Sequence, residues 1–367
     1  MQSDGETARG EDKEVNQEVN PWLSASAERS DAAGGPRVTP SKSVTISKLC
    51  DSSPNFSGSG KKLLRWRLGR LIGEGAYAQV YQGINADSGE LMAVKQIFFS
   101  EVSFQDNKKK RTEAIRALQR EIDVMKMLQH DNIVKYLGTE TDEGRLNIFL
   151  EYVSGGSIAS LIANFGALDE PVVRKYTRQI LIGLEFLHSK GVVHCDIKGG
   201  NILVTEDGII KLADFNSSKY LDSITGGGSN PLKSLLGTPQ FMAPEVIRQT
   251  GHGKKADIWS VGCTVIQMLT GAPPWDEISN KVTLMFHIAT APNGPPLPDD
   301  LQEDARDFLG KTFKLDARER PHCAELLKSR FVTLLEAAGD PPTSVGAAQP
   351  QHHEIAQDED SRRPPLL

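Results

Sequence analysis

The chain has 367 residues, of which 38% are hydrophobic and 25% charged, and its net charge is −6 at pH 7. This composition is ordinary for a globular protein with room for two or three domain-sized units, and the acidic balance argues against a nucleic-acid binder, which is usually basic. No apolar run is long enough to span a bilayer, the opening residues lack the apolar core of a secretory signal, and the four scattered cysteines are typical of reduced intracellular thiols. We therefore expect a cytoplasmic protein with no membrane span.

Residues 1–62 and 336–367 are predicted to be disordered tails around one domain at 63–335. The first tail is rich in Ser, Gly, Asp and Glu, and the second contains two Pro-Pro pairs. Neither shows the apolar periodicity that would bury enough surface to offset the entropy of ordering. Two interpretations stay open for such segments: an inert linker, or a docking site for an upstream activator or scaffold.

The domain begins with a part rich in predicted strands, at about residues 66–153. Three strands are predicted from WRLGRLIGEG, AQVYQGI and LMAVKQIFF, with a Gly-bearing turn between the first two. A helix is predicted from about Arg111 to Leu128, because apolar residues recur there at helical spacing. Its apolar face comprises Ile115, Leu118, Ile122 and Met125. IVKYLG and LNIFLEYV predict two further strands, so this part forms a small, mainly β lobe with one long helix.

Residues from about 154 to 332 are predicted to be mainly helical. The segment after Pro171 has its apolar residues on one helical face, and Asp169 stands where a helix cap belongs. DIWSVGCTVIQMLTG is apolar almost all round, which is typical of a buried helix. Gly271 is expected to end that helix.

A glycine-bearing turn between the first two strands is the first candidate for chemistry. It has the pattern Gly73-x-Gly75-x-x-Ala78-x-Val80. Glycines allow a backbone to approach phosphates closely, and phosphoryl transfer needs such a cradle together with a carboxylate-held metal and a group that orients the attacking hydroxyl. On its own, however, a hairpin turn with glycines would explain the same pattern.

Lys95 lies in the otherwise apolar third strand, where a buried ammonium group needs an anion or a carboxylate as partner. Glu121 on the predicted helix would supply the carboxylate. The alternative is a lysine that extends its charged end to solvent from the edge of a strand.

The strongest evidence is a series of motifs in a fixed order. It comprises His194-Cys195-Asp196-Ile197-Lys198-Gly199-Gly200-Asn201, Asp214-Phe215-Asn216, Gly237-Thr238-Pro239, Ala243-Pro244-Glu245, Asp257 and Arg320. Each element alone is common by chance, but this order and spacing are improbable without a shared fold.

Residues from about 66 to 332 resemble a eukaryotic protein kinase domain, and within that family the MEKK-like (sterile-type) MAP kinase kinase kinases. The resemblance rests on FLEYVSGGSI, HCDIKGGNILV, GTPQFMAPEVI and TGHGKKADIWSVGCTVIQMLTGAPPW. It implies an α+β, two-lobed protein kinase fold, with a small mainly-β N-lobe at about 66–153 and a larger mainly-α C-lobe at about 154–332. It also implies a serine/threonine kinase that uses ATP and Mg²⁺ and phosphorylates a downstream kinase.

The resemblance assigns roles to residues on the nucleotide side. Nucleotide contacts are expected from Gly73, Gly75, Val80, Ala93, Lys95, Glu121, Glu151, Val153 and Leu203. Among these, Lys95 is expected to hold the α- and β-phosphates and to pair with Glu121, and Glu151 and Val153 are expected to offer backbone hydrogen bonds in the hinge. Leu150 is the expected gatekeeper.

The resemblance also assigns the chemical roles. Asp196 is expected to orient or accept the substrate hydroxyl proton, and Lys198 to neutralise charge on the γ-phosphate. Asn201 and Asp214 are the expected magnesium ligands, and Thr238 is expected to shape the substrate groove.

Three further residues are expected to act structurally. Glu245 and Arg320 are predicted to form an ion pair, and Asp257 is predicted to brace the catalytic loop.

Three positions depart from the family pattern. Ala78 replaces the third glycine of the loop, which is expected to tune nucleotide affinity only. Asn216 replaces the glycine after the metal-binding Asp-Phe pair, and Asn is among the few residues that tolerate a positive φ. Cys195 replaces the arginine that receives the activation-loop phosphate in many kinases, so phosphorylation of the candidate site Ser234 is expected to couple weakly to the catalytic loop.

The departures leave two classes of function open. An active kinase is favoured because all six polar residues of the expected catalytic machinery are present. The alternative is a pseudokinase that binds nucleotide and partners as a scaffold with little turnover, for which Cys195 and Asn216 are the evidence. A nucleotide sensor without protein substrates has no supporting feature.

Overall fold

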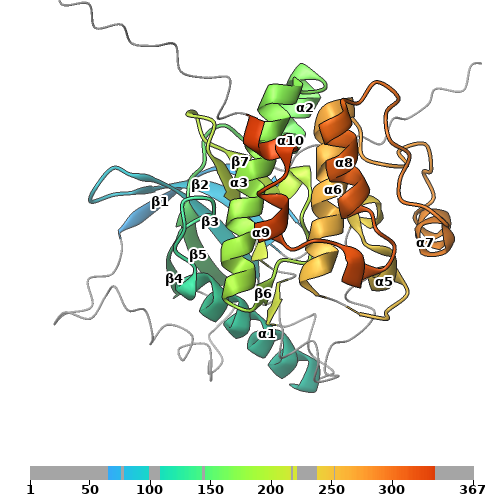
Figure 1. The fold of residues 1–367 in the computed structure, drawn as a ribbon. Helices are drawn as coiled ribbons and strands as arrows, with labels where there is room; N and C mark the ends of the chain where they lie inside the picture. The colour runs from blue at the N-terminus through green and yellow to red at the C-terminus, as the bar shows by residue number, and fades with distance from the viewer. Residues whose placement is uncertain are drawn as a thin grey trace, which may run out of the picture.

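The computed structural model describes residues 65–75, 78–98, 108–142, 145–215, 218–220, 238–251 and 253–334. Both predicted tails, Asn216 and Ser234 lie outside these ranges. Figure 1 shows a β-sheet with one long helix on one side and a larger group of helices on the other. The predicted α+β architecture of two lobes is therefore confirmed. None of the helices in the described ranges has the length and apolar character that a membrane crossing requires.

The small lobe is built on an antiparallel five-stranded sheet in the order β1-β2-β3-β5-β4. Its strands are β1 (Trp66–Glu74), β2 (Ala78–Asn85), β3 (Leu91–Phe98), β4 (Tyr136–Asp142) and β5 (Arg145–Glu151). The helix α1 (Lys108–Met127) begins slightly earlier than predicted. Its residues Leu118, Ile122 and Met125 are buried as expected, and this packing holds α1 against the sheet.

The fourth strand starts later in the chain than the sequence predicted. IVKYLG predicted a strand from Ile133, but β4 starts at Tyr136. Ile133 instead forms an isolated bridge with Leu212 of the larger lobe, and the Val134 N–H donates to the Leu212 carbonyl at 2.9 Å. Contact with the other lobe therefore overrides the local strand preference of these two residues.

The larger lobe contains the remaining elements. Its helices are α2 (Ile158–Phe165), α3 (Glu170–Ser189), α5 (Pro244–Ile247), α6 (Lys254–Thr270), α7 (Lys281–Thr290), α8 (Glu303–Thr312), α9 (Cys323–Leu326) and α10 (Arg330–Thr333). Its 3-10 turns are η3 (Gly199–Asn201), η6 (Pro239–Phe241) and η7 (Ala317–Glu319), and its short strands are β6 (Val192–Val193), β7 (Ile202–Val204), β8 (Ile210–Leu212) and β9 (Lys219–Tyr220).

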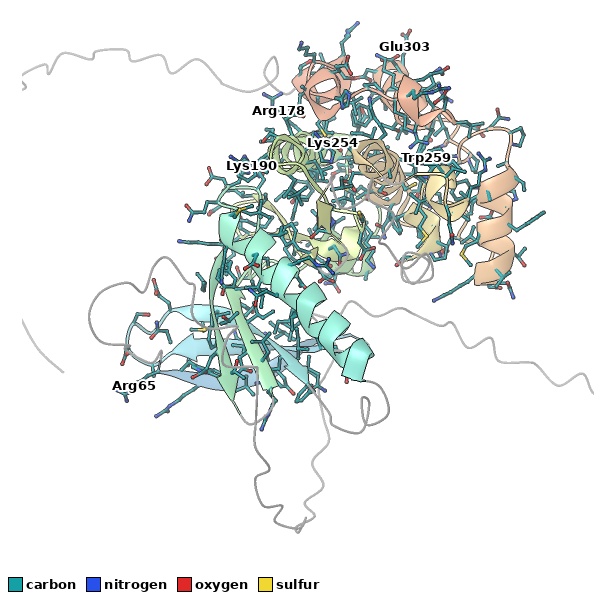
Figure 2. The ribbon with its side chains drawn as sticks, turned by 90° about the horizontal axis from the view of Figure 1, so that it is seen from below. Arg65, Arg178, Lys190, Lys254, Trp259 and Glu303 are labelled. Carbon is teal, nitrogen blue, oxygen red and sulfur yellow. The ribbon has the colours of Figure 1, made fainter. Side chains whose placement is uncertain are left out.

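Helix α6 is the buried centre of the larger lobe, as its apolar sequence predicted. Trp259 lies on this helix within the lobe (Figure 2) and is 1% exposed. Gly262 permits close packing, since a Cβ there would lie 2.3 Å from the Thr312 hydroxyl oxygen. The helix ends at Gly271, whose φ of 82° is the left-handed conformation that glycine adopts without strain.

Two short two-stranded sheets flank the segments that carry the predicted catalytic residues. Strand β7 pairs with β8, and β6 pairs with β9. The segment from His194 to Asn201 lies between β6 and β7, and Asp214 follows β8 by two residues. Because β7 and β8 are adjacent and antiparallel, the start of β7 and the end of β8 bring Asn201 and Asp214 to the same end of the hairpin.

Candidate active site

An apolar cluster joins residues of the two lobes. It comprises Val134, Val153, Leu203 and Ala213, with Leu150 packed against it. The sequence predicted Val153, Leu203 and Leu150 but missed Val134 and Ala213. An apolar, largely preformed floor of this kind suits a planar base.

The hinge between the lobes follows β5. The backbone N–H of Glu151 donates to the Lys135 carbonyl at 2.9 Å, so this N–H is already used within the protein. The Glu151 carboxylate is 2.8 Å from Lys211 Nζ and accepts the Lys135 N–H at 3.0 Å. These bonds link the hinge to β8 of the larger lobe.

The glycine pattern falls where β1 ends and β2 begins. Gly73 is opposite Val80 in the β1–β2 register, and the Gly75 N–H donates to the Ala78 carbonyl at 2.8 Å. Ala93, in the middle of β3, is 2% exposed. A Cβ at Gly75 would make only an ordinary 3.6 Å contact with the Ala78 carbonyl oxygen, so packing within the protein does not explain why glycine stands there.

Lys95 brings together one carboxylate from each lobe. Its Nζ lies 3.5 Å from Glu121 Oε1 on α1 and 3.0 Å from Asp214 Oδ1. The side chains of Lys95 and Glu121 are 10% and 11% exposed, whereas that of Asp214 is 41% exposed. The predicted Lys95–Glu121 pair is thus present, and Lys95 does not extend to solvent.

The three charged side chains shift one another's pKa values. Burial disfavours the charged ammonium group, but Asp214 and Glu121 outweigh it and raise the pKa of Lys95. Partial burial opposes ionisation of Asp214, but the charge and hydrogen bond of Lys95 outweigh it and hold the pKa of Asp214 below the usual value. Burial raises the pKa of Glu121, against the lowering effect of Lys95. Asp214 is therefore the ionised, accessible carboxylate of the cluster.

The catalytic loop forms a second polar cluster. The Asn201 amide Nδ2 donates to Asp196 Oδ2 at 2.7 Å and to the Asp196 carbonyl at 2.9 Å. Lys198 Nζ lies 3.3 Å from Asp196 Oδ2 and donates to the Thr238 hydroxyl at 3.1 Å. The loop thus presents one carboxylate and one ammonium group beside η6, which follows Thr238.

The Asn201 amide and the Asp214 carboxylate fit a magnesium ion. The Ala213 N–H donates to the Asn201 carbonyl at 2.9 Å, which places Asp214 next to Asn201. Because Nδ2 of Asn201 is bound to Asp196, its Oδ1 is the atom available as a ligand. An amide oxygen and an ionised carboxylate are hard oxygen donors of the kind that Mg²⁺ takes together with phosphates. Within the described ranges, no three His, Cys, Asp or Glu side chains converge to hold a metal without such help.

Asp257 of α6 fixes the backbone at the start of the loop from His194 to Asn201. Its carboxylate accepts the backbone N–H groups of His194 and Cys195, each at 2.9 Å, and lies 2.8 Å from Nε2 of His188. Cys195 adopts a φ of 66°, a left-handed conformation that costs a non-glycine residue about 1–2 kcal/mol. The sequence predicted the role of Asp257 but missed His188, whose Nδ1 lies 3.7 Å from the buried Cys323 Sγ.

Glu245 and Arg320 form the predicted ion pair. The guanidinium donates to Glu245 Oε1 at 2.6 Å and to Oε2 at 2.9 Å. The Arg320 side chain is 0% exposed, and its guanidinium lies 5.0 Å above the Trp259 ring. This pair ties the start of α5 to the segment that follows η7.

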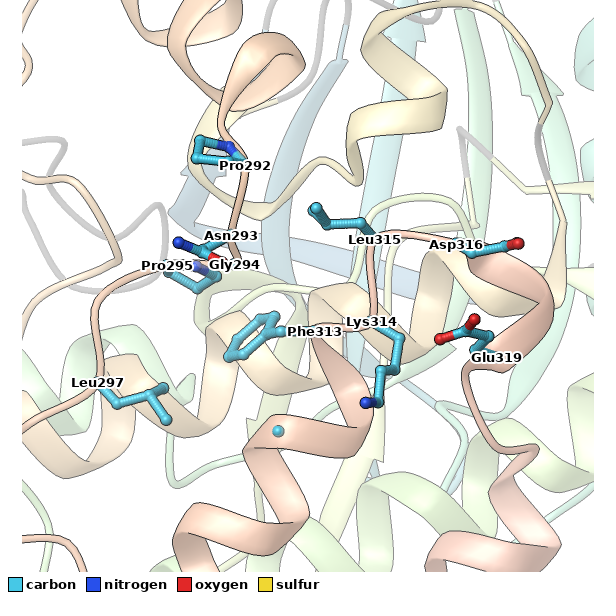
Figure 3. Close-up of a pocket in the computed structure, with 11 residues that line it drawn as sticks. Pro292, Asn293, Gly294, Pro295, Leu297, Phe313, Lys314, Leu315, Asp316 and Glu319 are labelled. Atoms are coloured by element: carbon cyan, nitrogen blue, oxygen red, sulfur yellow. The ribbon is translucent and has the colours of Figure 1, made fainter.

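A separate cavity of about 530 Å³ opens on the larger lobe, away from these residues (Figure 3). It is lined by Pro292, Asn293, Gly294, Pro295, Leu297, Gly310, Phe313, Lys314, Leu315, Asp316 and Glu319. None of the predicted site residues belongs to it.

Comparisons with known proteins agree with this geometry. The protein kinase domain family matches residues 66–332. Mitogen-activated protein kinase kinase kinase 2 of Arabidopsis thaliana is 50% identical over 295 residues, which cover 80% of this chain and 44% of that protein. Mitogen-activated protein kinase kinase kinase ANP1 of the same plant is 52% identical, with 73% and 40% covered. The human mitogen-activated protein kinase kinase kinase 3 is 46% identical, with 74% and 42% covered. The chain thus spans less than half the length of these relatives.

Proposed function

This chain belongs to the protein kinase domain family, and on that premise we propose that it transfers the γ-phosphoryl group of ATP to a Ser or Thr of a protein substrate. The observation that supports this most is the convergence of Lys95, Glu121 and Asp214 next to Asp196 and its neighbours. A pseudokinase function is not proposed, because the side chains that the proposed reaction would use are all present and make the contacts described above.

The nucleotide would lie between the apolar floor and the glycine turn. Lys95 would hold the α- and β-phosphates, since its ammonium group is kept charged and is fixed by two carboxylates. Glu151 and Val153 would offer backbone groups to the adenine. Asn201 and Asp214 would hold Mg²⁺, which neutralises phosphate charge when bound.

The chemical step would depend on the catalytic loop. Asp196 would accept a hydrogen bond from the substrate hydroxyl and orient its oxygen, and Lys198 would place a positive charge beside the transferred group. Lys198 also donates to Thr238, so the same ammonium group links the reacting centre to the proposed substrate groove. A lysine at this position supports Ser and Thr rather than Tyr as acceptors.

We further propose that the substrate is a MAP kinase kinase. The support is the name that the relatives share, mitogen-activated protein kinase kinase kinase. A cytoplasmic location and an upstream activator or scaffold that binds the tails are part of this proposal.

A phosphotransfer assay with the full chain, a kinase-inactive MAP kinase kinase and MgATP tests the proposal. Asp214→Asn and Asp196→Asn should each reduce kcat by several orders of magnitude, because one removes a magnesium ligand and the other the group that orients the hydroxyl. Thermal unfolding of each variant checks that the fold is intact. Near-wild-type turnover of both folded variants, or no turnover by the wild type, would show that the assignment is wrong.

A further inference from the structure

The 3-10 turn η3 forms the end of the catalytic loop, from Gly199 to Asn201, and both of these residues are buried. The first N–H of a helical turn has no acceptor within the turn, and the side chain directly before the turn usually supplies one. Here that residue is Lys198, whose ammonium group can only donate. The buried N–H of Gly199 therefore needs an acceptor from another element.

Gln267 of α6 supplies this acceptor. The backbone N–H of Gly199 donates to the side-chain Oε1 of Gln267 at 3.2 Å, and α6 is in contact with η3. The same buried helix carries Asp257, which accepts the N–H groups at the start of the catalytic loop. Helix α6 therefore holds this loop at two places, at its start through Asp257 and near its end through Gln267.

The bond to Gln267 fixes one peptide group between two of the proposed functional residues. The N–H of Gly199 and the carbonyl of Lys198 belong to the same planar peptide unit. The N–H is bound by Gln267, and the carbonyl accepts the Asn201 N–H at 3.0 Å. Because this unit is bonded on both sides, a rotation of it would move the backbone of Lys198 and Asn201 together.

The glycine at position 199 is matched to Gln267. A Cβ at Gly199 would lie 2.5 Å from Gln267 Oε1 and 3.2 Å from the backbone nitrogen of Ala159 in α2. Gly199 does not have a positive φ, so this position does not need the conformational freedom of glycine. The close approach of Gln267 and α2 explains why a residue without a side chain stands there.

We propose that Gln267 is a positioning residue for phosphoryl transfer, which orients Lys198 and Asn201 by accepting the Gly199 N–H. This inference rests on the proposed function and adds a residue that acts through the catalytic loop. The role needs only the acceptor oxygen, so glutamate should replace glutamine at this position. Methionine has nearly the same length but only a weak acceptor, so it should not.

Steady-state phosphotransfer by the full chain to a peptide measures the effect on catalysis. Gln267→Met should lower kcat about tenfold and leave KM for ATP within about threefold, because the nucleotide contacts come from other residues. Gln267→Glu should keep kcat within about threefold of the wild type. Gly199→Ala, whose Cβ would displace the Gln267 oxygen, should lower kcat at least about tenfold. Adding Gln267→Met to it should cost less than about threefold more, because both changes remove the same bond.

Gln179→Met is the matched control. The Oε1 of Gln179 on α3 accepts the backbone N–H of Ile210 at 2.9 Å, so this change also removes the acceptor of a backbone N–H, but outside the catalytic loop. It should lower Tm and leave kcat within about twofold of the wild type. A general loss of stability would therefore be distinguished from a loss of positioning.

Hydrogen–deuterium exchange gives a second measurement that does not depend on turnover. Exchange in residues 194–201 should be faster in Gln267→Met than in the wild type and unchanged in Gln267→Glu and Gln179→Met. Wild-type kcat and exchange in Gln267→Met would overturn the inference. So would an equal loss of kcat in Gln267→Glu or Gln179→Met, or losses that multiply in the double variant. If the wild type transfers no phosphate, the proposed function fails, and the exchange rates still decide whether Gln267 holds the loop.

Discussion

Asp257→Asn should disturb the loop from His194 to Asn201 without altering any of the proposed nucleotide-binding residues. The Asp257 side chain is 1% exposed and accepts the N–H groups of His194 and Cys195 and the hydrogen bond of His188. Burial opposes its ionisation, but the hydrogen bonds from His188 and His194 hold the pKa of Asp257 below its usual value. Asparagine keeps only one acceptor oxygen, so one backbone N–H of the loop would face an amide NH₂ group.

The expected cost follows from that lost partner. A buried donor without an acceptor costs about 1–3 kcal/mol, and the loss of charge leaves the remaining bond weaker. We expect the free energy of unfolding to fall by about 2–3 kcal/mol, which lowers Tm by roughly 5–10 °C. Because Asp196 directly follows Cys195, kcat should fall by about 10–100-fold. The KM for ATP should change by less than about threefold, since the nucleotide-binding residues are held by other elements.

Thermal unfolding and steady-state phosphotransfer to a peptide measure both effects. Thr264→Val is the control on the same helix: Thr264 is fully buried, and its hydroxyl donates to the Ser260 carbonyl one turn earlier. It should leave kcat within about twofold of the wild type. The reasoning is refuted if Asp257→Asn keeps wild-type kcat and Tm, or if Thr264→Val reduces kcat as much.

Three other substitutions have clear expected outcomes. Glu245→Ala should lower Tm by roughly 6–15 °C, because it leaves the buried Arg320 guanidinium unpaired at a cost of about 3–5 kcal/mol; a change under about 2 °C by calorimetry would contradict this. Lys95→Met should reduce kcat in a phosphotransfer assay by at least about 100-fold, because it removes the cation that holds the phosphates, and equal turnover would exclude Lys95 as the phosphate ligand. Ser234→Ala should change turnover only modestly, and Cys195→Arg should make turnover more sensitive to phosphatase; loss of wild-type activity after phosphatase treatment would count against this.

The sequence predicted the site well where one motif contains the interacting residues. Asp196, Lys198 and Asn201 lie within one short loop, and their mutual contacts follow from it. It also predicted the Lys95–Glu121 pair, because a buried lysine on a strand needs a carboxylate from the neighbouring helix.

Other partners depend on tertiary packing that local sequence patterns do not contain. His188 looks like an ordinary last-turn residue of α3 until α6 brings Asp257 to its Nε2. Val134 belongs to the apolar cluster with Val153 and Leu203, and its N–H pairs with Leu212, far along the chain, instead of continuing β4. These contacts could not be read from periodicity, since each joins two segments whose approach is set by the whole core.

Backbone conformation was the hardest property to predict. The sequence drew attention to Asn216 as the residue that tolerates a positive φ, but that residue lies outside the described ranges. Within them, Cys195 and Asp214 adopt φ values of 66° and 63°. Unlike glycine, cysteine and aspartate do not adopt a positive φ freely, so the residue type alone did not predict this conformation. At Cys195 the hydrogen bond from its N–H to Asp257 supports this conformation, and strained backbone of this kind is commonly found at functional sites.

The hydrogen bonds that Asp257 accepts from His194 and Cys195 also affect how the kinase would be regulated. Holding Cys195 in the left-handed region costs about 1–2 kcal/mol, whereas each hydrogen bond to a charged group contributes about 1.5–3 kcal/mol. The two N–H groups bound by Asp257 are therefore enough to fix the loop from within the larger lobe. A phosphate on the segment after Asp214 would find no guanidinium at position 195 and would have little left to order in the catalytic loop. The substitution of cysteine for arginine is thus compatible with activity, and it predicts that phosphorylation acts on substrate access more than on the position of Asp196.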